Sequence, residues 1–167
     1  MKTRLTRFAV VVVGVALLAM PAWAQLPLQV LYPSGSALEL SAQEVVFDLV
    51  SRGFPPRDLP AYYLPRRPEG PIALRLFSNL EEAWVLSAEL EPLATENGHW
   101  LLPDRIELRL DGGPWLPLQL EKGTVLLMGS GPTNGYEEHR LELRLKIVGD
   151  EVPGTYSGVL VLSLSRF

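Results

Sequence analysis

The sequence lacks cysteine altogether and has only two histidines among its 167 residues. Disulfide bonds and zinc sites built on thiolates are therefore excluded. The histidines, His99 and His139, lie far apart, and neither has a second ligand at a motif-like spacing. A calcium site using Asp58, Asp104 or Asp111 stays an alternative, although no oxygen-rich loop motif supports it. We predict that the protein binds no metal and no other cofactor.

The chain also lacks the motifs of common hydrolases. Gly129-Ser130-Gly131 does not have the spacing of a Gly-x-Ser-x-Gly nucleophile turn. The glycine-rich stretch 129–135 has no phosphate-binding lysine, and a strand pattern follows it, so we expect a loop there. Adjacent carboxylates such as Asp150-Glu151 lie at loops or strand starts, and neighbours within a strand point to opposite faces, so adjacency there creates no shared proton site. We predict that the protein is not an enzyme; a hydrolase stays an alternative for which no cluster can be named.

Basic clusters are scarce. Arg66-Arg67 is the only adjacent basic pair, and it lies in a proline-rich stretch. The net charge of −4 becomes −7 when the first 24 residues, which hold three basic side chains and no acidic one, are set aside. A net-negative chain without a basic cluster is poorly suited to hold phosphate backbones, so nucleic acid is excluded as a partner.

The N-terminus has the three-part pattern of a secretory signal peptide. Lys2, Arg4 and Arg7 precede an apolar run from Phe8 to Met20, and small residues flank a cut before Gln25. The run is too short to cross a bilayer comfortably as a mature helix. We therefore expect secretion to the periplasm or cell surface and no membrane span in the mature chain.

This pattern sets the domain organisation. A signal peptide over residues 1–24 leaves one domain over residues 25–167, which is 143 residues long. A domain of that length can bury a sufficient core without disulfide bonds.

Alternation of apolar and polar residues dominates the chain from its middle onward. Leu141, Leu143, Leu145 and Ile147 would share one face of an extended segment, with charged residues on the other. The same period of two occurs in segments 72–77, 84–90, 106–110, 116–120 and 155–165. Turn signals separate the segments, and the spacing leaves no room for crossover helices. We predict an all-β fold, a single antiparallel immunoglobulin-like β-sandwich.

Two segments are harder to interpret. Residues 41–53 could form a helix that begins with a capping box at Ser41, but the β-branched Val45 and Val46 favour a strand. Residues 53–71 hold six prolines, which cannot donate the hydrogen bonds of a central strand. We expect a stiff surface connection there, and a loop of this length usually covers or binds something.

Two sets of residues are candidates for contacts with a ligand or partner. Tyr62, Tyr63, Trp100 and Trp115 lie in loops or at turn edges, where aromatic rings stack on sugars, anchor a protein partner or cap the core. Leu26, Leu28 and Val30 alternate near the new N-terminus. That segment could pair with a sheet edge in its own chain or in a neighbouring subunit.

The C-terminal run 153–164 resembles the closing strand of bacterial surface β-sandwiches. Such families include spore-coat and fimbrial-type secreted proteins and the WxL cell-surface domains, and Trp84-Val85-Leu86 fits the W-x-L pattern literally. Phe47-Asp48, followed by Pro55-Pro56 and Pro60, is similar to early segments of these proteins. The resemblance implies a non-catalytic surface, coat or fibre component, so no catalytic residues carry over.

These observations together favour a secreted, non-catalytic β-sandwich with a structural or adhesive role in the cell envelope or a surface fibre. Its expected partner is an envelope or fibre protein, a second copy of the chain included. The alternative is a carbohydrate-binding module of the periplasm or cell surface.

Overall fold

The computed structural model describes residues 23–49, 53–120, 122–152 and 154–166. The predicted signal peptide over residues 1–24 therefore lies almost wholly outside the described residues. Strands dominate the described part, together with the short 3-10 turn η2 (Pro103–Arg105). No helix in these ranges is long and apolar enough to cross a membrane.

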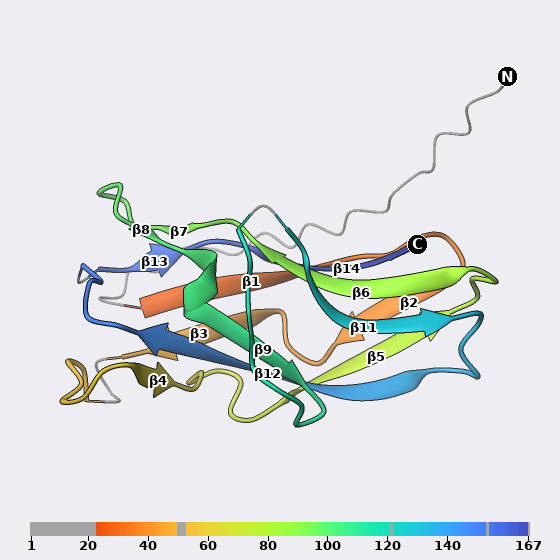
Figure 1. Ribbon diagram of the computed structural model, residues 1–167, viewed down its shortest axis with the longest axis horizontal. Helices are drawn as coiled ribbons and strands as arrows, with labels where there is room; N and C mark the ends of the chain where they lie inside the picture. The colour runs from red at the N-terminus through yellow and green to blue at the C-terminus, as the bar shows by residue number, and fades with distance from the viewer. Residues whose placement is uncertain (1–22, 50–52, 121, 153, 167) are drawn as a thin grey trace, which may run out of the picture.

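The strands form two sheets, one above the other in Figure 1. The eight-stranded sheet has the order β11-β6-β14-β1-β13-β7-β8, with β3 paired to β1; the six-stranded sheet has the order β10-β9-β12-β5-β2, with β4 paired to β12. The first sheet contains β1 (Trp23–Leu31), β3 (Glu44–Asp48), β6 (Ala83–Leu90), β7 (Leu93–Ala94), β8 (Trp100–Leu101), β11 (Thr124–Ser130), β13 (Tyr156–Ser157) and β14 (Leu160–Arg166). The second contains β2 (Ser36–Leu40), β4 (Ala61–Tyr63), β5 (Ile72–Ser78), β9 (Ile106–Leu110), β10 (Leu116–Pro117) and β12 (Glu137–Ile147).

The core lies between the two sheets and follows the predicted alternation. In β12, every second residue from Leu141 to Ile147 is at most 2% exposed, while Glu142, Arg144 and Lys146 face outward. The even-numbered residues of β5 and of β6 are buried in the same way. Burial of one face per sheet is the packing of a β-sandwich, so the predicted fold class is confirmed.

One pairing differs from the expected antiparallel arrangement. The first strand, β1, runs parallel to β13 and β14, with Leu28 opposite Leu160 and Leu31 opposite Ser163. A parallel pair needs a long connection, but the connection need not be a helix. Here the strands β2 to β12 all lie between β1 and its parallel partners in the sequence, so the connection is long enough.

The structure describes the two difficult segments except for residues 50–52. Residues 44–48 form β3, with Val45 and Phe47 fully buried, so the strand interpretation is confirmed. The proline-rich stretch contains β4, which pairs with β12 as an outer strand. This position suits its sequence, because prolines that flank an edge strand remove no bond from the sheet interior.

Two local expectations were wrong. We expected Leu116, Leu118 and Leu120 to share a buried face, but β10 ends at Pro117, and Leu120 is 51% exposed. We also expected a loop from residue 129, but Gly129 and Ser130 are the last residues of β11.

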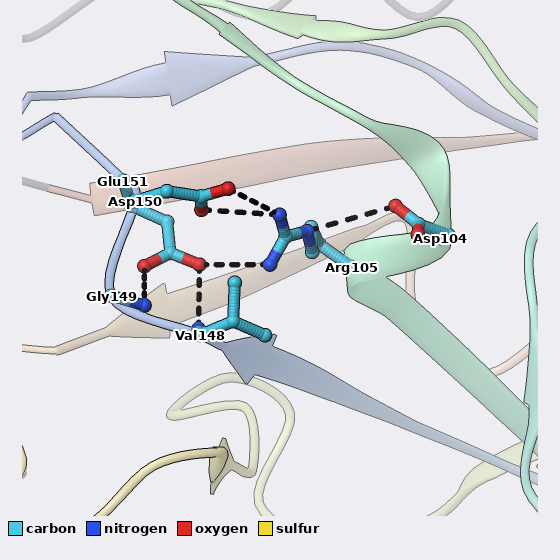
Figure 2. A network of polar contacts seen from close by, with 6 residues as sticks. All are labelled: Asp104, Arg105, Val148, Gly149, Asp150 and Glu151. Atoms are coloured by element: carbon cyan, nitrogen blue, oxygen red, sulfur yellow. Dashed lines mark hydrogen bonds and ion pairs between the residues drawn. The ribbon is translucent and has the colours of Figure 1, made fainter.

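A polar network joins the 3-10 turn η2 to the loop after β12 (Figure 2). Arg105 donates to Asp150 Oδ2 at 2.9 Å and to Glu151 Oε1 at 3.2 Å. The Glu151 carboxylate is buried and also accepts the backbone N–H groups of Val148 and Gly149, both at 2.7 Å. The two adjacent carboxylates converge on one guanidinium, because they lie in the loop after β12, where strand alternation does not apply.

Candidate functional site

Two cross-strand ion pairs join β9 and β12 on the outer face of the six-stranded sheet. The register of β9 and β12 places Arg109 opposite Glu142 and Glu107 opposite Arg144. Arg109 donates to both oxygens of Glu142, at 2.7 and 2.9 Å, and Arg144 Nε donates to Glu107 Oε2 at 2.6 Å. Opposite charges that face each other across a ladder stabilise the pairing.

The bidentate pair also shifts the acidity of its members. The hydrogen bond from Arg109 is the main cause that lowers the pKa of Glu142 below its ordinary value. The same bond raises the pKa of Arg109. Both groups are therefore held in their charged forms at neutral pH.

Two aromatic rings stack on these guanidinium groups. The Arg144 guanidinium carbon lies 3.9 Å from the ring centroid of Tyr62 and 4.3 Å from that of Trp115. The Arg109 guanidinium carbon lies 4.5 Å from the same tryptophan ring. We call this group the Arg144 cluster; it comprises Tyr62, Glu107, Arg109, Trp115, Glu142 and Arg144. Guanidinium–aromatic contacts each contribute about 0.5–1 kcal/mol at exposed sites, and they fix the orientation of both partners.

The cluster brings together two of the four aromatic residues that the sequence singled out. Tyr62 comes from β4, opposite Lys146 of β12, and Trp115 comes from the turn that precedes β10. Tyr63 is buried at 8% exposure, because its neighbour in the strand occupies the outer face, so it offers no surface to a ligand. Trp100 is 66% exposed, but it belongs to β8 of the other sheet.

A cleft of about 340 Å³ adjoins the cluster. On one side β12 pairs with β5 as far as Leu141 and with β4 from Leu145 onward, which leaves a gap in the ladder between them. The proline-rich stretch passes this gap, and the cleft is lined by Leu64, Pro65, Pro68, Glu69, Gly70, Ile72, Leu141, Glu142 and Leu143. Its volume is within the range of small-ligand sites. Two of the six prolines of the stretch, Pro65 and Pro68, thus line this cleft.

A second guanidinium–aromatic group lies over β5 on the same sheet. The Arg75 guanidinium carbon is 4.4 Å from the ring centroid of Tyr136, and that ring also contacts Phe77. The Tyr136 hydroxyl donates to Glu39 at 3.2 Å. Burial, together with the negative charge of Glu39, raises the pKa of Tyr136, so its hydroxyl stays protonated at neutral pH.

The histidines and aspartates of the sequence analysis do not form a metal site in the described residues. No group of three metal-ligating side chains is present within those ranges. His139 lies near the start of β12, and its Nδ1 is 2.7 Å from Asp111 Oδ2. Burial raises the pKa of Asp111, but the hydrogen bonds from His139 and the Arg140 backbone outweigh it, so the net pKa is lowered. His99 is exposed beside the turn between β7 and β8.

The candidate assembly strand lies within its own sheet. Leu26 is fully buried and pairs with Val45 of β3, whereas Leu28 and Val30 pair with β14 and are partly buried. In the structure this segment pairs within its own chain. In this position the segment is a structural strand between β3 and β14.

Sequence reasoning missed the arginines and glutamates of the cluster. Their alternation along β9 and β12 indicates the solvent-exposed face of a sheet. That signal alone does not distinguish a binding site from an ordinary surface. Comparisons of the chain with protein-family models, curated proteins and solved structures find no match.

Proposed function

We propose that the protein is a secreted, non-catalytic β-sandwich with a structural or adhesive role in the cell envelope or a surface fibre. In this proposal the Arg144 cluster is the surface that contacts the partner. The resemblance of the closing strand to bacterial surface sandwiches and the signal-peptide pattern support the location.

The observation that carries the proposal is the stacking of Trp115 and Tyr62 on Arg144. Tryptophan, tyrosine and arginine are the residues that dominate binding energy at protein interfaces. Glu107 and Glu142 hold the two arginines in place, so few side chains lose freedom when a partner binds. A surface that is both rich in these residues and ordered in advance is suited to recognition.

The test measures binding of the fluorescently labelled protein to cell envelopes of the producing organism. We expect the double variant Tyr62→Ala/Trp115→Ala to bind at least about tenfold more weakly, as loss of interface anchors does. The matched control is Trp100→Ala, which removes an even more exposed tryptophan outside the cluster. Equal binding by the double variant and the wild type would refute the proposed surface, provided that circular dichroism shows both folded.

The alternative function is carbohydrate binding, and the cleft beside the cluster favours it specifically. Glu69 and Glu142 line the cleft together with apolar residues, and the exposed ring of Tyr62 belongs to the adjoining cluster. A sugar is usually held by carboxylates that accept hydrogen bonds from its hydroxyl groups and by an aromatic ring that packs against its apolar face. Tryptophan fluorescence titrated with a glycan panel tests this function, because a sugar at the cluster would alter the emission of Trp115. A silent panel with unchanged thermal stability would count against it.

A further inference from the structure

The strand β11 forms one edge of the eight-stranded sheet. Within the described part of the chain it pairs only with β6. Its seven residues, Thr-Val-Leu-Leu-Met-Gly-Ser, include no charge and no proline. Edge strands expose unpaired backbone N–H and C=O groups, and proteins usually protect them with charged side chains, proline, β-bulges or short length. An irregularity follows Val125, but the pairing is regular from Leu127 to Ser130.

The side chains of this edge are also exposed and apolar. Val125 is 46% and Met128 is 65% exposed, which places two large apolar groups on an edge that carries no charge. A strand of this composition pairs readily with another strand, since nothing in it repels a partner. We propose that β11 pairs in antiparallel fashion with β11 of a second copy of this chain, so that two eight-stranded sheets become one continuous sheet.

Charges at the two ends of β11 favour a second copy as the partner. Lys122 is exposed just before the strand. At the other end the backbone carbonyl of Glu82 accepts the N–H of Gly131, and the Glu82 carboxylate is 63% exposed. Antiparallel pairing about a two-fold axis brings the Lys122 end of each copy to the Glu82 end of the other. Parallel pairing would place like ends together and lacks this complementarity.

The proposal is tested by sedimentation velocity of the purified protein over about 1 to 200 µM, a range that suits a weak interface of one strand edge. We expect a concentration-dependent dimer. Met128→Glu should raise its dissociation constant at least about tenfold, because it would bury a charge among the apolar side chains of Val125 and Met128 at the contact. The melting temperature should not change, since Met128 is largely exposed. The matched control, Trp100→Glu, places the same charge on the edge strand β8 and should dimerise normally.

A charge exchange tests the orientation. Lys122→Glu and Glu82→Lys should each weaken the dimer, and the double variant should restore it. A wild-type protein that stays monomeric at every concentration would overturn the proposal, as would a dimer that Met128→Glu leaves intact. A double variant no stronger than its single parents would also overturn it. Trp115→Ala should dimerise like the wild type, so this inference stands or fails independently of the proposed function.

Discussion

Replacing Gly129 with alanine should destabilise the protein, although the same change usually stabilises a strand. Gly129 does not have a positive φ, so its backbone accommodates any residue. In such a position Gly→Ala typically adds about 0.4–1 kcal/mol of stability, because it restricts the unfolded chain. The obstacle is Trp84, which lies opposite Gly129 in β6 and is 4% exposed. A methyl group at Gly129 would lie 2.2 Å from Cζ2 and 2.4 Å from Cε2 of that ring.

The size of the effect follows from what must move. A carbon cannot stay at 2.2 Å from another, so either β11 moves away from β6 or the indole leaves its position. Overpacking of this kind costs about 1–3 kcal/mol. Displacement of the ring would also break the bond from Trp84 Nε1 to the Gly131 carbonyl, now 3.0 Å, at about 0.5–1.5 kcal/mol. The net loss after the entropic gain should be about 1–3 kcal/mol.

Urea unfolding followed by far-UV circular dichroism measures this loss. Ser130→Ala, one residue further along β11 at an exposed position, is the control and should stay within about 0.5 kcal/mol of the wild type. Trp84→Phe removes the indole atoms that would clash, so Gly129→Ala should cost at least about 1 kcal/mol less in that background. A Gly129→Ala variant as stable as the wild type, or an equal cost in both backgrounds, would refute this reasoning.

Three further predictions rest on single contacts. Arg105→Met should cost about 3 kcal/mol in urea unfolding, because it leaves the buried Glu151 without its charge partner; adding Glu151→Gln should recover part of the loss. The folded pKa of Glu142 lies below its ordinary value of 4.5, so its ion pair with Arg109 stabilises the fold above about pH 4.5 and weakens as the pH falls through the lowered pKa. Glu142→Gln should therefore flatten the decline of the urea midpoint in that acidic range. Tyr156→Phe removes the 2.7 Å bond to a backbone carbonyl four residues upstream and should lower the unfolding free energy by about 1 kcal/mol, as measured by chemical denaturation.

The sequence predicted those strands whose alternation is long and regular. β12 and β6 show it over residues 141–147 and 84–90, and every inward residue of these two segments is buried. β11 was missed because the irregularity after Val125 breaks the period of two, and glycine at its end resembles loop sequence. The parallel pairing of β1 with β14 could not be predicted, because alternation reports which face is buried and not which strand lies alongside.

Of the residues in the candidate site, only the two aromatic ones were predicted from the sequence. Tyr62 and Trp115 stood out by residue type, and nothing in the sequence placed them together. Their meeting depends on the registers of β4 and β9 with β12, which bring Arg144 within reach of both rings. Tyr63 was selected for the same reason as its neighbour, and its burial follows from strand alternation within a segment that was expected to be a loop.

The two proposed surfaces impose a condition on any fibre. Pairing through β11 extends the eight-stranded sheet in its own plane and leaves the outer face of the six-stranded sheet uncovered. A two-fold contact uses the same edge in both copies and is therefore closed, so it cannot propagate by itself. A longer assembly then needs a contact of a different kind, and the Arg144 cluster is the ordered surface left for it. It follows that a Met128→Glu monomer should still bind its partner, whereas the Tyr62→Ala/Trp115→Ala variant should stop at the dimer.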